Sequence, residues 1–154
     1  MSMTSLKRII SGGQTGVDRA GLDVAFDLGI PCGGWCPKGR RAVDGPIPDK
    51  YPLKEIEAEN YNKRTQLNVQ DSDGTLVFYR GELEGGTAYT VKLADQYGKP
   101  CLLVDVESPV SAAEFWSWID THKIEVLNVA GPREEGRPGI YQQAYKLLKT
   151  YLSK

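Results

Sequence analysis

Short apolar runs rich in β-branched residues alternate along the chain with amphipathic segments of helical period. This alternation predicts a mostly parallel sheet whose strands are joined by crossover helices. The first predicted strand covers Leu6–Ser11 and is interrupted by two glycines. A helix is predicted next over Val17–Leu28, where Ala20, Val24 and Leu28 recur at helical spacing.

The same pattern predicts the rest of the secondary structure. Further strands are predicted at Ile30–Gly34, Thr75–Tyr79, Cys101–Asp105 and Ile124–Val129. Further helices are predicted at Leu53–Val69 with a break near Glu59 and Asn60, at Gly86–Tyr97, from Ser111 onward, and after Gly139 to the C-terminus. Ser111 and Glu114 have the spacing of a capping box. Trp35–Pro52 is predicted to be a long loop, and its aromatic and basic residues favour a functional role.

These elements predict an α/β fold of Rossmann type. We expect an open three-layer sandwich in which a mostly parallel sheet of about five strands is flanked by helices. At 154 residues the chain is long enough for one core, and no linker divides it, so residues 1–154 are expected to form a single domain. The expected order of the five strands, numbered along the chain, is 3-2-1-4-5.

Composition and charge exclude several classes of function. The 19 Lys and Arg nearly balance the 20 Asp and Glu, whereas a general nucleic-acid-binding protein carries a basic excess. No stretch approaches the roughly 18 apolar residues that span a bilayer, and the N-terminus lacks the apolar region of a signal peptide. The charge balance and the lack of a long apolar stretch therefore predict neither nucleic acid nor a membrane as a partner. Three cysteines cannot all pair, so we expect the protein to work in the reducing cytoplasm. A lone histidine leaves no His-rich metal site and no Ser-His-Asp triad.

Glycines and basic residues follow the predicted strands at one edge of the sheet. Ligands of an open parallel sheet bind beyond the carboxyl ends of its strands. Glycines let backbone N–H groups approach an anion, helix N-termini add partial positive charge, and arginine donates two hydrogen bonds to one phosphate. This edge is therefore expected to be locally positive and to bind an anion, and Trp35 or Tyr79 is the aromatic ring expected to stack on a ligand that carries a ring. The candidate ligand-binding residues are Gly12, Gly13, Gln14, Thr15, Gly16, Trp35, Lys38, Arg40, Arg41, Gly85, Gly86, Thr87 and Arg133.

Other polar residues have simpler structural interpretations. Asp71 and Asp73 precede a predicted strand and should lie at the opposite, amino edge, where turn and capping roles are expected instead of a metal site. His122 falls near a helix C-terminus, which an imidazolium stabilises. Arg64 lies early in a helix that descends from the ligand edge, so it either reaches the site or lies on a solvated helix face. Trp116 is expected in the core.

Two motifs carry a resemblance to a known family. Ser11–Arg19 reads SGGQTGVDR and Gly33–Arg41 reads GGWCPKGRR. Together they resemble the putative molybdenum carrier family, also described as the circularly permuted YpsA family, within the SLOG group of Rossmann-like proteins. The match continues nearly to the end of the chain, through Tyr51–Leu53, Arg64–Thr65, Asn68–Val69, Asp71–Thr75, Gly85–Thr87 and Asn128–Arg133.

The resemblance implies a binding function. SLOG proteins bind nucleotide-derived ligands, and the family takes its name from proteins that bind and carry the molybdenum cofactor, a phosphorylated pterin dithiolene, as homo-oligomers. The resemblance therefore implies a carrier for a phosphorylated heterocycle, with the molybdenum cofactor or molybdate as cargo and a homo-oligomeric assembly. It places the ligand on the same glycines and basic residues that follow the predicted strands.

One departure from related enzymes disfavours hydrolysis. The phosphoribohydrolases of the superfamily carry a Pro-Gly-Gly-x-Gly-Thr-x-x-Glu motif with a catalytic Glu. Here Thr87 matches the Thr, but Thr90 stands where the Glu is expected, and a threonine is no general base at neutral pH. Val43 also stands where the family suggests an acidic residue. Two alternatives stay open: an enzyme that cleaves nucleotides with Asp18 or Asp44, and a sensor of a nucleotide-derived ligand.

Overall fold

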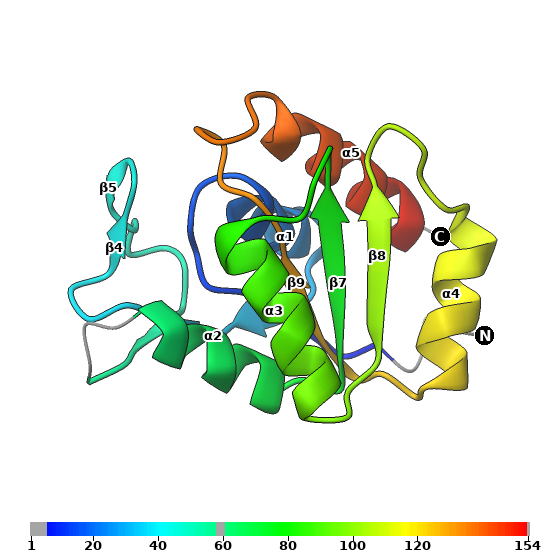
Figure 1. Cartoon of the computed structure of the whole chain (residues 1–154), viewed down its shortest axis with the longest axis horizontal. Helices are drawn as coiled ribbons and strands as arrows, with labels where there is room; N and C mark the ends of the chain where they lie inside the picture. The colour runs from blue at the N-terminus through cyan, green and yellow to red at the C-terminus, as the bar shows by residue number, and fades with distance from the viewer. Residues whose placement is uncertain (1–5, 58–60, 154) are drawn as a thin grey trace.

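A five-stranded parallel sheet forms the centre of the molecule (Figure 1). The computed structural model describes residues 6–57 and 61–153. The strands of this sheet are β1 (Arg8–Ile10), β2 (Cys32–Gly33), β7 (Gly74–Tyr79), β8 (Cys101–Asp105) and β9 (Val126–Ala130). All four pairings between neighbouring strands are parallel, which confirms the predicted mostly parallel sheet.

The order of the strands differs from the expected one. The sheet runs β2-β1-β9-β7-β8, so the last strand of the chain inserts between the first strand and β7. Arg8 lies opposite Val126 on one side of β9, and Gly74 lies opposite Leu127 on the other. The expected order 3-2-1-4-5 is wrong because it places the fifth strand at an edge of the sheet and the third strand beside the second. A central strand must be buried on both faces, and β9 meets this requirement because Leu127 on one face is 0% exposed and Asn128 on the other is 3% exposed.

Helices cover both faces of the sheet and complete three layers. On one face lie α1 (Val17–Leu28), α4 (Ala112–Thr121) and α5 (Ile140–Leu152), whose apolar sides share one core with the strands. On the other lie α2 (Tyr61–Gln70) and α3 (Gly85–Gln96) (Figure 1). The described residues thus form the predicted α/β Rossmann-like sandwich. None of their helices is long and apolar enough to span a membrane.

Aromatic rings fill the core between the sheet, α4 and α5. Phe115 stacks on Tyr151 with ring centroids 4.9 Å apart and meets Trp116 edge-on at 5.1 Å. The indole N–H of Trp116 donates to the carbonyl of Tyr151 at 2.7 Å, so its polar atom is satisfied inside the core. The predicted core role of Trp116 is confirmed. The predicted capping box is also present, since the N–H of Glu114 donates to Ser111 Oγ and the N–H of Ser111 to Glu114 Oε1.

The predicted loop after β2 contains short strands. In this segment β3 (Trp35–Cys36) pairs with β6 (Lys54–Glu55), and β4 (Arg41–Ala42) forms a hairpin with β5 (Gly45–Pro46). The helix expected from Leu53 begins instead at Tyr61, because residues 53–56 are extended beside β3 and bury two apolar side chains. The break expected near Glu59 and Asn60 lies outside the described residues.

Arg40 holds this segment together by hydrogen bonds. Its guanidinium donates to the carbonyl oxygens of four residues at 2.8–3.2 Å, which are Ile47, Pro48, Tyr51 and Leu53. A single cation thereby satisfies carbonyl groups of a chain segment that has little regular pairing of its own. Arg40 therefore stabilises the loop that it belongs to.

The amino edge of the sheet has the expected turn. Asp73 accepts hydrogen bonds from the backbone N–H groups of Glu125 at 3.0 Å and Val126 at 2.9 Å, which ties the start of β7 to the start of β9. Asp71 accepts from the indole N–H of Trp35 at 2.7 Å. The structural roles predicted for Asp73 are thus confirmed. Within the described residues, no group of three or more His, Cys, Asp or Glu side chains could hold a metal ion.

Replacing Phe115 with Ala should lower the free energy of unfolding by about 3–5 kcal/mol, the usual cost of removing a fully buried aromatic ring. Phe115 is 0% exposed, whereas Phe26 is 41% exposed, so Phe26→Ala is the matched control and should cost about 1 kcal/mol or less. Urea denaturation of both variants measures the difference. Equal losses would contradict the assignment of Phe115 to the core.

Candidate functional site

A cavity of about 540 Å³ opens at the carboxyl edge of the sheet. Its volume lies within the range of small-molecule sites in proteins. Its walls come from the turn after β1, the end of β9 and the loop that follows it, the β7–α3 loop, α2 and the β4–β5 hairpin. The cavity therefore lies where the strand order predicts a crevice, over the carboxyl ends of β1, β9 and β7.

The start of α3 faces the open space of this cavity. Gly85 and Gly86 line it, and a Cβ atom built on either residue would meet none of the described residues within 4 Å apart from its chain neighbours and its own helix backbone. The first N–H groups of a helix have no acceptor within the helix, so they are directed outward. Thr87 lines the cavity one residue further on and is 7% exposed. This turn can donate backbone hydrogen bonds to a bound anion.

Two arginines reach the cavity from the loop after β9. Arg133 lies in its lining with an exposed side chain. Arg137 donates through Nε to the carbonyl of Arg80 at 2.7 Å and through Nη2 to that of Glu82 at 3.3 Å, and Glu84 lies 3.8 Å from its Nη2. Arg137 thus holds the β7–α3 loop against the loop after β9.

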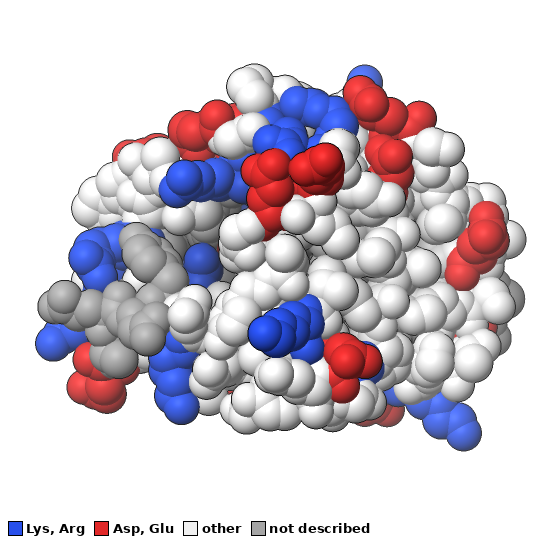
Figure 2. Space-filling view, in the orientation of Figure 1, with Lys and Arg blue, Asp and Glu red and all other residues white. Residues whose placement is uncertain are grey.

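The charges of the lining are balanced. Within the described residues, the acidic Asp18, Glu82 and Glu84 are matched by the basic Arg64, Arg133 and Arg137. Figure 2 shows basic and acidic side chains gathered together above the start of α3. The locally positive edge expected from the sequence is therefore not observed, because acidic residues of the β7–α3 loop and of α1 line the same cavity.

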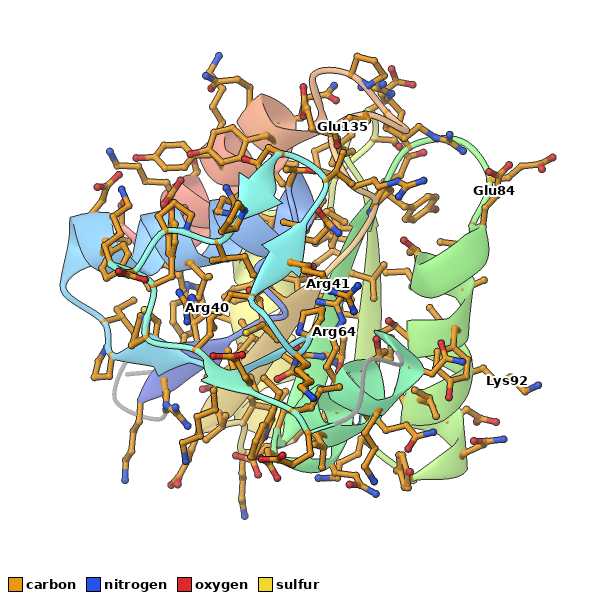
Figure 3. All side chains as sticks on the ribbon, turned by 90° about the vertical axis from the view of Figure 1, so that its left-hand side faces the viewer. Arg40, Arg41, Arg64, Glu84, Lys92 and Glu135 are labelled. Carbon is orange, nitrogen blue, oxygen red and sulfur yellow. The ribbon has the colours of Figure 1, made fainter. Side chains whose placement is uncertain are left out.

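Asp18 and Arg64 form a buried ion pair at the wall made by the first turn. Arg64 Nη1 lies 3.5 Å from Asp18 Oδ2, and the side chains are 12% and 11% exposed. Gly12 permits this approach, since a Cβ atom there would lie 1.8 Å from Arg64 Nη1. Figure 3 shows Arg64 in the interior, between the β4–β5 hairpin and α2. Of the two interpretations open for Arg64, the structure supports the one in which it reaches the site.

Burial raises the pKa of the Asp18 carboxyl to about 6. Arg64 and the backbone N–H groups of Gln14 and Gly12 act in the opposite direction, because each of them favours the ionised carboxylate. The result is a carboxyl group that titrates near neutral pH in the wall of the cavity. Asp44, the other carboxylate considered from the sequence, lies outside the lining and pairs with Arg19 at 3.1 Å, which lowers its pKa.

About half of the predicted ligand-binding residues line the cavity. Those in its lining are Gly12, Gln14, Gly85, Gly86, Thr87 and Arg133. Those outside it are Gly13, Thr15, Gly16, Trp35, Lys38, Arg40 and Arg41. Both sets come from segments that follow strands, so the difference depends on which way each segment turns after its strand ends.

The residues of the first turn that lie outside the lining bind the loop after β9 and α1. Thr15 Oγ1 donates to Glu135 Oε1 at 2.6 Å, and the carbonyl of Gly13 accepts from Arg19 Nε at 2.9 Å. Gly16 allows close contact, because a Cβ atom there would lie 2.4 Å from the carbonyl oxygen of Pro132. These contacts fix the loop after β9 against the start of α1.

The aromatic and basic residues after β2 lie outside the cavity lining and make contacts within their own segment or with α2 and the turn that follows it. The indole N–H of Trp35 is donated to Asp71, and Lys54 Nζ lies 5.6 Å from the centre of the Trp35 ring. Arg40 donates to carbonyl groups of its own loop, and Arg41 Nε donates to the carbonyl of Lys38 at 3.2 Å. Figure 3 shows Arg40 among the chain segments of this loop. In this structure, therefore, Trp35 does not offer its ring to a ligand in the cavity.

Sequence reasoning missed several residues of the lining as ligand contacts. Asn128 is 3% exposed on β9 and donates through Nδ2 to Thr75 Oγ1 at 3.3 Å. An amide inside an otherwise apolar strand is a signal that could have identified it. Asp18 and Arg64 could have been identified as a pair only with the fold known. Nothing in its local sequence distinguishes Arg137 from the neighbouring charged residues.

Comparisons with known proteins agree with this fold. The profile described as "Circularly permutated YpsA SLOG family" matches residues 9–152. Among solved structures, the chain is similar to a protein of Syntrophus aciditrophicus SB named "Putative molybdenum carrier protein", with 49% sequence identity, coverage of 96% of each chain and a TM-score of 0.92. No curated protein matches the chain.

Replacing Asp18 with Asn should change how stability depends on pH. The folded pKa of Asp18 is raised to about 6 from an ordinary value of 3.8, so the folded chain holds an extra proton between these pH values. Relative to Asp18→Asn, the wild type should therefore lose stability as the pH rises from 4 to 7, by about 2 kcal/mol. Urea denaturation at several pH values measures this difference.

Asp44→Asn is the matched control for this measurement. Because Arg19 lowers the pKa of Asp44, the wild type should gain stability relative to Asp44→Asn as the pH rises through the acidic range. A difference between wild type and Asp18→Asn that is constant from pH 4 to pH 7 would contradict the raised pKa of Asp18.

Proposed function

Because this chain belongs to the circularly permutated YpsA SLOG family, as the resemblance of its motifs indicated, we propose that it is a binding and carrier protein for a phosphorylated heterocycle. The cavity at the carboxyl edge of the sheet is the proposed site. The proposed cargo is the molybdenum cofactor, a phosphorylated pterin, or a molybdate-containing species. The name of the similar Syntrophus aciditrophicus protein supports this choice.

The observation that carries the proposal is the open turn at the start of α3, beside Arg133 in the same lining. A phosphate bound there would accept hydrogen bonds from the N–H groups of Gly85 and Gly86 and face the positive end of the helix dipole. Arg133 would add charged donors. Thr87, in the next position of the same turn, would contact the phosphate or its ester oxygen.

The rest of the cavity is suited to a ring. Val129 and Ala130 line it from β9, and Ala42 and Val43 line it from the β4–β5 hairpin. Val43 is 45% exposed, so its apolar surface is available to a ligand. We assign the heterocycle to these apolar walls, with Asn128 and Gln14 as the polar groups that bind its edge. A homo-oligomer in the cytoplasm is part of the same proposal, and sedimentation of the purified chain tests its assembly.

A nucleotide-cleaving enzyme is the second candidate, and it rests on Asp18. This carboxyl group lines the cavity, and burial raises its pKa to about 6, which suits proton transfer near neutral pH. Thr90, in the position of the related catalytic Glu, donates its hydroxyl to the carbonyl of Gly86 at 2.9 Å and supplies no carboxylate. Release of free base or phosphate from nucleoside monophosphates, abolished in Asp18→Asn, would favour the enzyme over the carrier.

A thermal-shift panel of phosphorylated pterins, nucleotides, molybdate and phosphate tests binding in the cavity. A ligand at about 100 times its dissociation constant should add about 2.7 kcal/mol of stability. Arg133→Ala should weaken binding of a phosphorylated ligand about tenfold, equivalent to about 1.4 kcal/mol, because a charged donor to the phosphate is lost. The stability of the unliganded variant should stay unchanged, since the Arg133 side chain is exposed.

Lys92→Ala is the matched control for charge. Lys92 is exposed on α3, outside the cavity lining (Figure 3), so its loss should leave the dissociation constant unchanged. Failure of every phosphorylated compound to bind would overturn the proposed function. Equal dissociation constants for wild type and Arg133→Ala would overturn the placement of the phosphate.

A further inference from the structure

The first turn of this sheet differs from a dinucleotide-binding turn in where its N–H groups point. In Rossmann dinucleotide sites, the glycine-rich turn after the first strand directs backbone N–H groups at a pyrophosphate, which lies at the N-terminus of the following helix. Here the corresponding turn is Ser11–Gly16, between β1 and α1. The N–H groups of Ser11, Gly13 and Thr15 in this turn have acceptors inside the protein.

Neutral oxygens accept hydrogen bonds from Gly13 and Thr15 of the turn and from Val17, the first residue of α1. The N–H of Gly13 donates to Ser11 Oγ at 3.3 Å, that of Thr15 to Gln14 Oε1 at 3.0 Å, and that of Val17 to the carbonyl of Pro132 at 3.1 Å. Gln14 Oε1 also accepts from the N–H of Val43 at 2.8 Å, which ties the turn to the β4–β5 hairpin. A ligand phosphate would have to break these bonds to use the same N–H groups.

A carboxylate of the protein lies directly beside this turn. Asp18 lies in the first turn of α1, and its Oδ2 would be 3.0 Å from a Cβ atom built on Gly12. The neighbouring backbone N–H groups of Gly12 and Gln14 favour the ionised form of this carboxyl and lower its pKa. Asp18 is 8% exposed and has its own cation, Arg64, at 3.5 Å. An anion belonging to the protein therefore occupies the place where a Rossmann protein holds pyrophosphate. A second ligand phosphate brought to this turn would meet a like charge at short range.

The opposite wall is built differently. At the start of α3, Gly85 and Gly86 face open space, and Arg133 lies in the same lining. Among the described residues the cavity thus has an open turn at the start of α3, and a first turn in which Gly13 and Thr15 already donate within the protein beside the Asp18 carboxylate. Its balanced charges likewise do not favour a ligand with several negative groups.

We infer that the cavity accepts ligands with a single phosphate monoester and rejects diphosphates and dinucleotides, with Asp18 as the residue that sets this selectivity. The inference rests on the proposed function and narrows its ligand class. It applies to a pterin or a nucleotide equally, since the shared chemistry is the number of linked phosphate groups. In this role Asp18 acts through the turn that it closes and through its charge.

Calorimetric titration of the full chain with matched ligand pairs tests the inference. The pairs are 6-hydroxymethylpterin monophosphate and diphosphate, GMP and GDP, AMP and ADP, and orthophosphate and pyrophosphate. All titrations are run at one ionic strength with a chelator, so that charge screening is equal and no metal bridges the phosphates. In each pair that binds, the monophosphate should bind at least tenfold more tightly than the diphosphate.

Two isosteric variants show whether the selectivity depends on the charge of Asp18 in particular or on the loss of any one negative charge. Asp18→Asn should raise the affinity for the diphosphates, so that the ratio between the members of a pair falls at least threefold. Asp44→Asn removes one negative charge from the neighbouring hairpin outside the lining and should keep the wild-type ratio. If Asp18→Asn fails to fold, the wild-type ratios decide alone.

The outcomes separate this inference from the function on which it rests. Diphosphates that bind the wild type as tightly as monophosphates would overturn the inference and leave the proposed function standing. A folded Asp18→Asn variant with the wild-type ratio would overturn the role of Asp18. Binding of no compound in the panel would overturn both the inference and the proposed function.

Discussion

The buried carboxylate of Asp18 is the constraint on which the carboxyl edge of the sheet depends. A charge inside a protein is tolerated only when it is paired and hydrogen-bonded, because its lost hydration must be compensated. Here the compensation comes from Arg64 on α2 and from N–H groups of the turn after β1. The same ion pair requires glycine at position 12, since a side chain there would displace the guanidinium of Arg64. One buried group thus determines the shape of the first turn, the position of α2 and the wall of the cavity that they share.

The two glycine-rich turns of the cavity consequently have different roles. The turn after β1 is closed by bonds within the protein, and Gly16 brings it into contact with the loop that follows β9. At the start of α3, the positions that a Cβ atom of Gly85 or Gly86 would take are open space among the described residues, and both glycines line the cavity. Glycine therefore serves packing at one turn and ligand access at the other. Family membership gives the fold, while this asymmetry identifies which part of the fold can receive an anion.

The sequence predicted the elements of the fold well because each depends on local pattern. Alternating apolar runs indicated the strands of the main sheet, and the spacing of Ser111 and Glu114 indicated a cap that is present. The strand order could not be predicted in the same way, because it depends on which strand is buried on both faces. Arg40 and Arg133 show that the residues of the site could not be fully predicted from local sequence either. Both follow a strand in a polar loop, but only the folded loop shows that Arg40 donates to its own carbonyl groups while Arg133 lines the cavity.

The position of β9 also has a consequence for how the chain folds as it is synthesised. β9 pairs with β1 on one side and with β7 on the other, although it is the last strand of the chain. The two halves of the sheet, β2-β1 and β7-β8, can each form early but cannot join until residue 130 has left the ribosome. Until then β1 and β7 present unpaired edges, which in nascent chains are sites for chaperone binding or aggregation. Contacts so distant in sequence also slow folding. The arrangement that builds the cavity therefore keeps the sheet in two separate halves until β9 is available to join them.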